Sequence, residues 1–338
     1  MGNKNSSIYI NLKNTSFFAG EVISGEVCLS LIQNVKCDTL VLEFLGFEET
    51  FWEEFSDKEE SKVAIRKGYE VICHNSIVLY QCHNRKMNYG KYSFPFVIMP
   101  PVNLPGSFSY SSKMTQSAIK YVISATLDSI PEPILGKQEI KLIQNQPEKI
   151  IKLSSATISQ PIRWCCFHQG NIFMRANTNK SAYLIGEKLE INLEIYSEIR
   201  HNNASVETVL YKTVLFKSEK RATKMIKYRI IQHRNMANIG PNAKREPKSL
   251  KICFGLDKGF VKQEIDEAYS TRGNLINCSY SIVSTVYLNS ITLHPNPNIE
   301  IFIDILPKIK RQKHPEINDW NPIKMPGVML QPSAPQLE

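Results

Sequence analysis

The chain has 338 residues, a length that suggests two domains. Of these residues 42% are hydrophobic and 22% are charged, and this composition excludes a disordered or fibrous protein. The formal net charge is +9 and the whole excess lies in residues 151–338, which favours an anionic partner there: a phosphoinositide-bearing membrane or a phosphorylated protein. No recognition helix or aromatic RNA-binding motif supports nucleic acid as that partner.

The first residues match the pattern for N-myristoylation, with Gly2 as the acceptor and Ser6 at the preferred hydroxyl position. They lack the apolar core of a signal peptide, and no later stretch is apolar enough for a transmembrane helix. We therefore expect a cytoplasmic protein whose cysteines are free thiols. One acyl chain binds membranes weakly, so lipidation would need a second contact, such as a basic patch in the second half. The alternative is an unmodified start before a strand at Ile8.

Apolar and polar residues alternate along the whole chain. The pattern is clear at residues 27–31 and 120–127, and it is sharper at residues 189–195 and 299–305. A period of two with one polar face is typical of antiparallel sheets packed on one side. The sequence therefore predicts an all-β protein built from two antiparallel β-sandwiches in tandem.

The polar segments between these strands suggest where the domains end. We expect an N-terminal sandwich over residues 1–155, a C-terminal sandwich over residues 156–307, and a flexible, Pro-rich tail over residues 308–338. A weak internal repeat supports duplication, because an aromatic residue and a Gly-Glu pair precede a strand at Phe18–Ile23 and again at Tyr183–Leu189. In both places the glycine is expected to supply the turn conformation.

Acidic residues crowd the segment from Glu48 to Glu60. A catalytic pair of carboxylates would need a pocket and a raised pKa in one partner, and crowded exposed acids provide neither. The segment is predicted to be an acidic surface loop. The sequence also lacks a nucleophile elbow, a phosphate-binding glycine loop and a plausible Ser-His-Asp set. We therefore expect no enzymatic activity and no cofactor.

Two Cys-His pairs, Cys73-His74 and Cys82-His83, raise the question of a zinc site. The residues between them read as a strand, and an odd separation of nine places the two cysteines on opposite faces of a continuous strand. The spacing therefore argues against a shared metal.

The densest basic run lies in the second half. It comprises Lys217, Lys220, Arg221, Lys224, Lys227 and Arg229. Several cations on one face would contact an anionic membrane or a phosphate group, since each contributes about 1 kcal/mol near such a surface. The alternative is a solvated strand edge that lysines keep from aggregating.

A series of motifs carries a family resemblance. In chain order they are Phe18–Val27, the Gly90-Lys91-Tyr92-Ser93-Phe94-Pro95-Phe96 segment followed by Pro100, Leu104-Pro105 and Ser107-Phe108, then Ile119–Ala125, Trp164-Cys165-Cys166, Tyr183–Glu187 and Asn277–Ile282. Together they resemble the arrestin-domain proteins, the α-arrestins in particular, from about residue 8 to residue 306. The resemblance implies two arrestin-type sandwiches and an adaptor role in the traffic of membrane-protein cargo, whose tails would be partners.

The chain departs from the α-arrestin pattern in one respect. The P-P-x-Y motif that docks the WW domains of ubiquitin ligases is missing, and Pro100-Pro101-Val102-Asn103 lacks the tyrosine. Recruitment of a ligase by that route is therefore not expected. The arrestin-like subunit of the retromer coat shares the fold and is the alternative assignment.

The tail contains a P-S-A-P motif at Pro332, Ser333, Ala334 and Pro335. This short sequence is the kind that engages the UEV domain of the ESCRT-I complex. Two prolines favour an extended shape, so that little entropy is lost on binding in a groove. The alternative is a chance match in a Pro-rich segment. We expect Pro332–Pro335 to recruit ESCRT-I.

Overall fold

The computed structural model describes residues 6–56, 59–144, 153–164, 167–199, 203–238, 248–256, 269–288, 295–308 and 321–331. In these ranges the chain forms β-strands, one short 3₁₀ turn, η1 (His83–Arg85), and no α-helix, which confirms the predicted all-β class. The same ranges hold no helix with the length and apolarity needed to cross a bilayer.

The first sandwich packs two sheets. One sheet has the strand order β1-β3-β7-β21 with β22 also on β7, and the other has the order β2-β10-β9-β4-β5 with β6 on β4 and β8 on β9. Its strands are β1 (Ser7–Leu12), β2 (Ser16–Phe18), β3 (Ile23–Leu31), β4 (Val35–Ser56), β5 (Glu59–Gln81), β6 (Lys86–Met87), β7 (Gly90–Ile98), β8 (Phe108–Ser112), β9 (Thr115–Ile130), β10 (Ile134–Ile143), β21 (Ile323–Lys324) and β22 (Val328–Leu330).

The second sandwich repeats this plan. One sheet has the order β11-β12-β14-β17, and the other has the order β13-β20-β19-β15-β16 with β18 on β19. Its strands are β11 (Ser154–Trp164), β12 (Phe167–Thr178), β13 (Ala182–Leu184), β14 (Lys188–Ser197), β15 (Asn203–Lys217), β16 (Thr223–Asn238), β17 (Lys248–Gly255), β18 (Thr271–Arg272), β19 (Ile276–Leu288) and β20 (Asn298–Leu306). The division expected between residues 155 and 156 falls at the first residues of β11.

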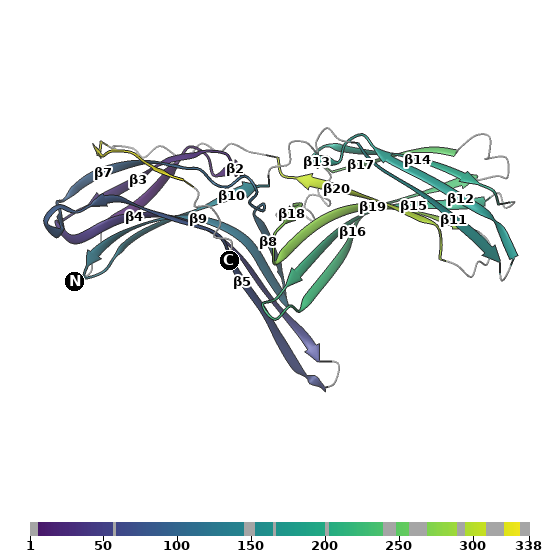
Figure 1. The fold of residues 1–338 in the computed structure, drawn as a ribbon, viewed down its shortest axis with the longest axis horizontal. Helices are drawn as coiled ribbons and strands as arrows, with labels where there is room; N and C mark the ends of the chain where they lie inside the picture. The colour runs from purple at the N-terminus through teal and green to yellow at the C-terminus, as the bar shows by residue number, and fades with distance from the viewer. Residues whose placement is uncertain are drawn as a thin grey trace.

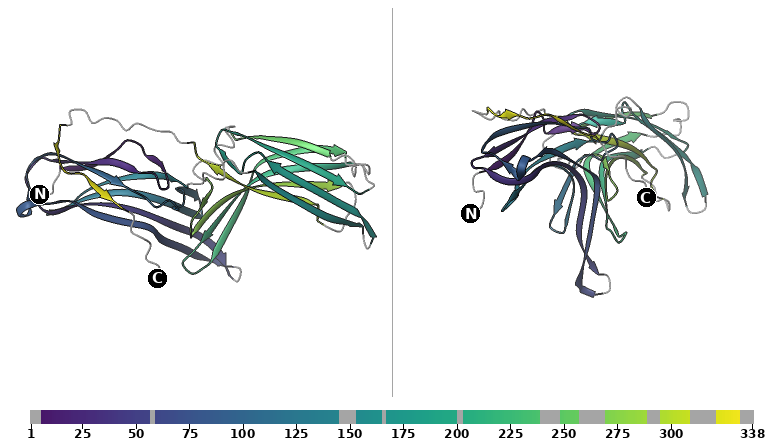
Figure 2. Two further views of the ribbon diagram at one scale, coloured as in Figure 1. Left: turned by 45° about the horizontal axis from the view of Figure 1, so that its top comes forward. Right: turned by 60° about the vertical axis from the view of Figure 1, so that its left-hand side comes forward.

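The two sandwiches lie end to end and give an elongated molecule (Figure 1). The long β4–β5 hairpin reaches beyond the body of the first sandwich and passes beside the ends of β15 and β16, as Figures 1 and 2 both show. The junction is therefore built from β4, β5 and β8 on one side and from β15, β16, β18 and β19 on the other.

The alternating segments form the cores, as their sequence pattern predicts. Val27, Leu29 and Leu31 of β3 are buried, and so are the four isoleucines and leucines at alternate positions in β14, from Leu189 to Ile195. Their polar neighbours Glu190 and Glu194 stay partly exposed. Each sheet therefore buries one face against its partner sheet, and the apolar period of two is what specifies the register.

The internal repeat corresponds to two equivalent turns. Gly20 and Gly186 have φ angles of 83° and 93°, in the left-handed region that a residue without Cβ adopts readily. The glutamate after each glycine accepts a hydrogen bond from the strand before the turn, Phe18 N to Glu21 Oε2 at 2.8 Å and Leu184 N to Glu187 Oε2 at 3.0 Å. Each turn follows a short strand that pairs in parallel, β2 with β10 and β13 with β20.

The described part of the tail differs from the expected flexible segment. Residues 321–331 return to the first sandwich, where β21 and β22 pair in parallel with β7. Backbone hydrogen bonds hold both strands, from Met325 N to Ser93 O at 2.9 Å and from Met99 N to Leu330 O at 3.1 Å. The Leu330 side chain is 4% exposed, so its burial against the core anchors this segment.

Candidate functional site

The structure divides the predicted basic run into two groups. Lys217 is the last residue of β15, and Lys220 and Arg221 lie in the turn between β15 and β16; all three are exposed, and we call them the turn cations. The turn is tight, with Arg221 in the left-handed region at a φ of 61° and its N–H donating to Ser218 O at 2.9 Å. Three cations are thereby presented at the junction of the two sandwiches.

Lys227 and Arg229 lie further along β16, on the outer face of its sheet. Both pack on the Tyr211 ring, with Lys227 Nζ 4.4 Å and the Arg229 guanidinium carbon 6.0 Å from its centre. Carboxylates approach both: Glu207 lies 3.0 Å from Arg229 and Glu300 lies 3.9 Å from Lys227. The hydrogen bond to the Tyr211 hydroxyl, assisted by Glu207, raises the pKa of Arg229. These two cations are therefore partly neutralised within the sheet.

Lys224 turns to the opposite face of β16, because successive side chains of a strand point to opposite faces. Its Nζ donates to Thr115 Oγ1 of the first sandwich at 3.0 Å. Beside it, the hydroxyls of Tyr110 and Tyr228 are hydrogen-bonded across the junction. Lys224 thus joins the two sandwiches, and the six predicted cations do not form one patch.

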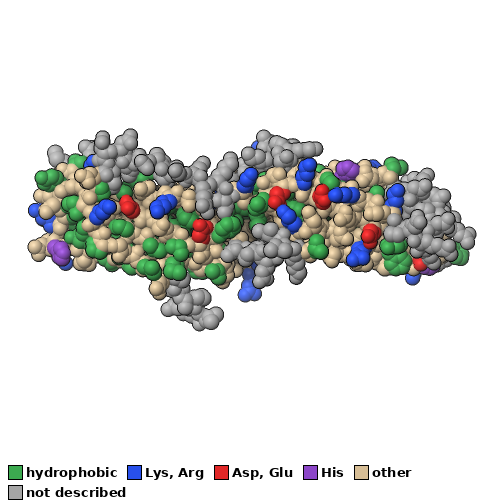
Figure 3. Space-filling view, turned by 90° about the horizontal axis from the view of Figure 1, so that it is seen from above, with side chains coloured by type: hydrophobic (Ala, Val, Ile, Leu, Met, Phe, Trp, Pro, Cys, Tyr) green, Lys and Arg blue, Asp and Glu red, His purple; other side chains and the backbone are tan. Residues whose placement is uncertain are grey.

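On the opposite face of the molecule, the described side chains show no concentration of charge of one sign. In Figure 3, which looks down on the two sandwiches from above, basic and acidic side chains are interspersed among the described residues. The turn cations are three exposed cations within residues 217–221, with one exposed acidic residue, Glu219, between Lys217 and Lys220.

A buried carboxylate at the junction is the feature that sequence reasoning missed. Glu48, expected in an exposed acidic loop, lies inside β4 and is fully buried. Its carboxylate accepts hydrogen bonds from three successive backbone N–H groups of the second sandwich, Asn274 and Leu275 at 2.8 Å and Ile276 at 2.9 Å. We call this arrangement the domain clasp.

Two glycines allow the two sandwiches to approach closely at the domain clasp and beside it. A Cβ on Gly273 would overlap the Glu48 carboxylate, and a Cβ on Gly68 would overlap both Thr50 Oγ1 and the Lys217 carbonyl. Thr50 Oγ1 donates to Lys217 O at 2.7 Å, and Glu219 N donates to Lys67 O at 3.1 Å. The turn that carries the turn cations is therefore fixed against the β4–β5 hairpin.

Burial raises the pKa of Glu48, and the charge of Glu70 adds to the rise, while the three backbone N–H groups oppose it. A raised folded-state pKa means that the stability contributed by this group is fully present below its unfolded pKa and is lost as the pH rises through the folded value. We expect the destabilisation caused by Glu48→Gln, which cannot titrate, to be larger at acidic pH than at neutral pH. Urea unfolding of both proteins over a pH series measures this. If the destabilisation caused by Glu48→Gln instead grows as the pH rises, the three hydrogen bonds affect the pKa of Glu48 more than burial does.

The cysteines of the Cys-His pairs are buried or half-buried thiols. Burial raises the pKa of Cys73 to about 12, and burial also raises the pKa of Cys82, whose nearest thiol neighbour is Cys37. The described ranges contain no group of three or more side chains placed to hold a metal ion. These thiols are part of the core of the first sandwich.

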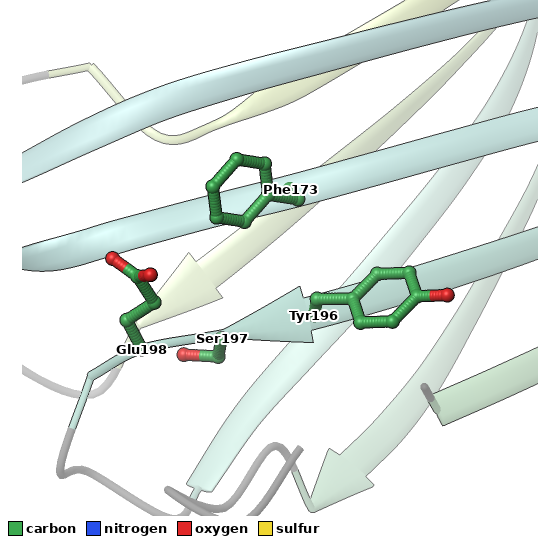
Figure 4. Close-up of a pocket in the computed structure, with 4 residues that line it drawn as sticks. All are labelled: Phe173, Tyr196, Ser197 and Glu198. Carbon is green, nitrogen blue, oxygen red and sulfur yellow. The ribbon is translucent and has the colours of Figure 1, made fainter. Parts of the chain in front are cut away.

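A small open pocket lies at the far end of the second sandwich (Figure 4). It has a volume of about 390 Å³ and is lined by Phe173, Tyr196, Ser197 and Glu198. Glu198 Oε2 already accepts hydrogen bonds from the backbone and side-chain nitrogens of Asn171, at 3.0 and 2.8 Å. The Ser197 hydroxyl accepts one from Ile199 N at 3.2 Å. The Glu198 carboxylate and the Ser197 hydroxyl are thus engaged in hydrogen bonds within the sandwich.

Two predicted sites lie outside the described residues. These are the lipidation site at Gly2 and the motif at Pro332–Pro335. The structure does place Gln331, the residue before the motif, whose carbonyl accepts a hydrogen bond from Asn75 Nδ2 of β5 at 3.3 Å.

Comparison with known proteins agrees with this architecture. Residues 6–146 match the family model described as arrestin (or S-antigen), N-terminal domain. Arrestin domain-containing protein A of Dictyostelium discoideum is 27% identical over 212 residues, 59% of this chain and 35% of that protein. Arrestin domain-containing protein 17 of Caenorhabditis elegans is 21% identical over 198 residues, 56% of this chain and 46% of that protein. This chain therefore spans about a third of the length of the first relative and less than half of the length of the second.

A third relative is aligned over most of both chains. Arrestin domain-containing protein 5 of Bos taurus is 23% identical in an alignment of 308 residues that covers 82% of this chain and 83% of that protein. The alignment therefore includes both sandwiches of the present chain.

Proposed function

From the premise that this chain is an arrestin-domain protein, we propose that it is a non-enzymatic adaptor of the α-arrestin type. In this role it links membrane-protein cargo, or the endosomal membrane itself, to ESCRT-I through Pro332–Pro335. The observation that carries the proposal is the course of the tail: β22 fixes Leu330 to the first sandwich, and the motif begins two residues later. The motif is therefore tethered to the sandwiches by a very short connection.

The proposed mechanism is bridging. The P-S-A-P peptide is short and has two prolines, so it offers a UEV groove an extended segment with few conformations to lose. Such a contact is modest by itself. A second contact on the same chain, to a cargo tail or a membrane, raises the effective concentration of the first and so increases the overall avidity.

We assign the proposed membrane contact to the turn cations. They are exposed and close together, whereas Lys227 and Arg229 have carboxylate neighbours and Lys224 contacts Thr115. A myristoyl chain on Gly2 would be the second anchor of a peripheral protein at the endosomal or plasma membrane, because one chain alone binds weakly.

Substitution of the motif tests the ESCRT-I assignment. Pro332→Ala with Pro335→Ala is expected to reduce capture of a purified UEV domain by at least about tenfold, because the extended shape and both proline contacts are lost. Titration of the full chain with the UEV domain gives the dissociation constants. Pro322→Ala with Pro326→Ala, in the same tail but outside the motif, is the matched control. Equal affinities for the wild type and the motif variant would eliminate Pro332–Pro335 as the binding site.

A further inference from the structure

The described part of the tail occupies a groove between the edges of two sheets. β21 and β22 pair with β7, which without them is the edge of its sheet among the described strands, and β22 also lies beside β5, the edge strand of the other sheet. Figure 2 shows this segment in yellow along the first sandwich. The Leu330 carbonyl accepts a hydrogen bond from Met99 N, and the Gln331 carbonyl accepts one from Asn75 of β5. The tail is thus bound to both walls of the groove.

The pairing of the tail with β7 is short and interrupted. Two stretches, Ile323–Lys324 and Val328–Leu330, pair with it. Between them three residues of the tail face two residues of β7, so the tail contains a β-bulge. Pro326 of the tail and Pro95 of β7 both lie in this interval, and neither has an N–H group to donate. Few backbone hydrogen bonds therefore hold the tail.

The side chains of the tail add little burial. Leu330 is 4% exposed, whereas Ile323 and Met329 are 56% and 53% exposed. A segment with one buried side chain and few hydrogen bonds opens at a small cost in free energy. The strand β7 does not depend on the tail, since all of its residues from Gly90 to Ile98 pair with β3. The β7 wall of the groove therefore remains formed when the tail dissociates.

The way in which the tail binds defines the kind of peptide that the groove accepts. An added strand is held by backbone hydrogen bonds, and pockets for alternate side chains give specificity. Val328 and Leu330 pack against the core of the sandwich, and Met329 between them is exposed. The groove thus fits an extended peptide that runs parallel to β7, has apolar residues at two alternate positions and places a branched aliphatic residue at the second of them.

We propose that the β7 edge is a binding site for extended apolar peptides of partner proteins, and that the tail is an internal competitor for this site. The partner segment takes the place of residues 323–330, with an aliphatic side chain in the position of Leu330. The tail belongs to the same chain, so its effective concentration at the groove is on the order of millimolar, and it weakens the binding of a partner peptide accordingly. The proposal is independent of the proposed function, because the P-S-A-P motif takes no part in it.

A labelled synthetic peptide with the sequence of residues 321–331 is the probe. Leu330→Asp in the full chain places a carboxylate at a buried position, which expels the tail. This variant is expected to bind the peptide at least about tenfold more tightly than the wild type does, because the competing tail has left. The matched control is Met329→Asp, at the exposed neighbouring position, which is expected to bind the peptide as weakly as the wild type. Fluorescence anisotropy gives the dissociation constants.

Substitutions in the peptide test the pocket for the aliphatic residue. The peptide with Leu330→Asp is expected to bind the Leu330→Asp chain at least about tenfold more weakly than the unchanged peptide, whereas the peptide with Met329→Asp keeps its affinity. If the Leu330→Asp chain is folded in urea unfolding but does not bind the unchanged peptide, or binds all three peptides equally, the β7 edge is not a peptide site. A dimer of the wild-type chain in sedimentation would assign the groove to the tail of a second copy instead.

Hydrogen exchange of the wild-type chain tests the release of the tail without a substitution. The Met325 amide, which donates to Ser93 O at 2.9 Å, is expected to exchange at least about a hundredfold faster than the amides of β3, because the tail opens alone whereas β3 opens only with the sandwich. Equal protection of the two segments would mean that the tail is a permanent strand of the sheet, and the proposed competition would be wrong.

Discussion

Replacing Glu48 with alanine is expected to lower the free energy of unfolding by about 3 to 5 kcal/mol. The carboxylate accepts three backbone N–H groups from Asn274 to Ile276 in a fully buried position. Alanine leaves these donors without an acceptor, and each unsatisfied buried donor costs about 1 to 3 kcal/mol, reduced where water enters the vacated space. The measurement is urea unfolding followed by circular dichroism.

The neighbouring glutamate is the natural control. Glu49 points to the other face of β4, where it forms a half-exposed ion pair with Lys120 at 2.6 Å. Pairs of that kind contribute about 1 kcal/mol or less, so Glu49→Ala is expected to be nearly neutral. If the two alanine variants unfold at the same urea concentration, the domain clasp does not contribute to stability as described.

Reversing two of the turn cations is expected to reduce binding to anionic vesicles roughly a thousandfold. Lys217→Glu with Lys220→Glu replaces two attractions of about 1 kcal/mol each by repulsions of similar size, a change of about 4 kcal/mol. Sedimentation with vesicles that contain phosphatidylserine measures the partition of the unacylated protein. Because the contact is electrostatic, added salt is expected to weaken wild-type binding as well.

A matched variant distinguishes a local contact of the turn cations with the vesicle from an effect of the net charge of the protein. Lys13→Glu with Lys36→Glu makes the same change in charge at two exposed positions of the first sandwich. We expect it to reduce vesicle binding less than tenfold, since neither residue lies at the β15–β16 turn. Equal losses in the two variants would mean that overall charge, rather than the turn cations, brings the protein to the membrane.

Much of the fold could be predicted from the sequence because it depends on local patterns. The alternation in β3, β9, β14 and β20 specifies which face is buried, and the Gly-Glu turns at Gly20 and Gly186 recur with the same hydrogen bonds. The strands β21 and β22 escaped prediction because they have two and three residues. What stabilises them is the pairing with β7 and the burial of Leu330, and neither is encoded in their own alternation.

The junction could not be predicted because its partners are far apart in the chain. Glu48 sits among Glu49, Glu53 and Glu54, and its neighbours suggest an exposed acidic segment; only the backbone of residues 274–276, more than 220 positions later, makes it a buried acceptor. The local density of Lys and Arg between residues 217 and 229 predicts the basic run. The structure divides these cations between the turn, the contact of Lys224 with Thr115, and the Tyr211 ring. This division follows from strand pleating and from the register of β16 with β15, which spacing alone does not specify.

The return of β22 to β7 also bears on how the protein is made. Synthesis runs from the N-terminus, so the second sandwich is complete before residues 323–330 leave the ribosome, and until then the β7 edge and the place of Leu330 are uncovered. The first sandwich to be translated is thus the last to be finished. An exposed strand edge in a nascent chain can pair with the wrong strand. The β7 edge stays exposed while more than two hundred further residues are translated, so we expect a chaperone to cover it during that time.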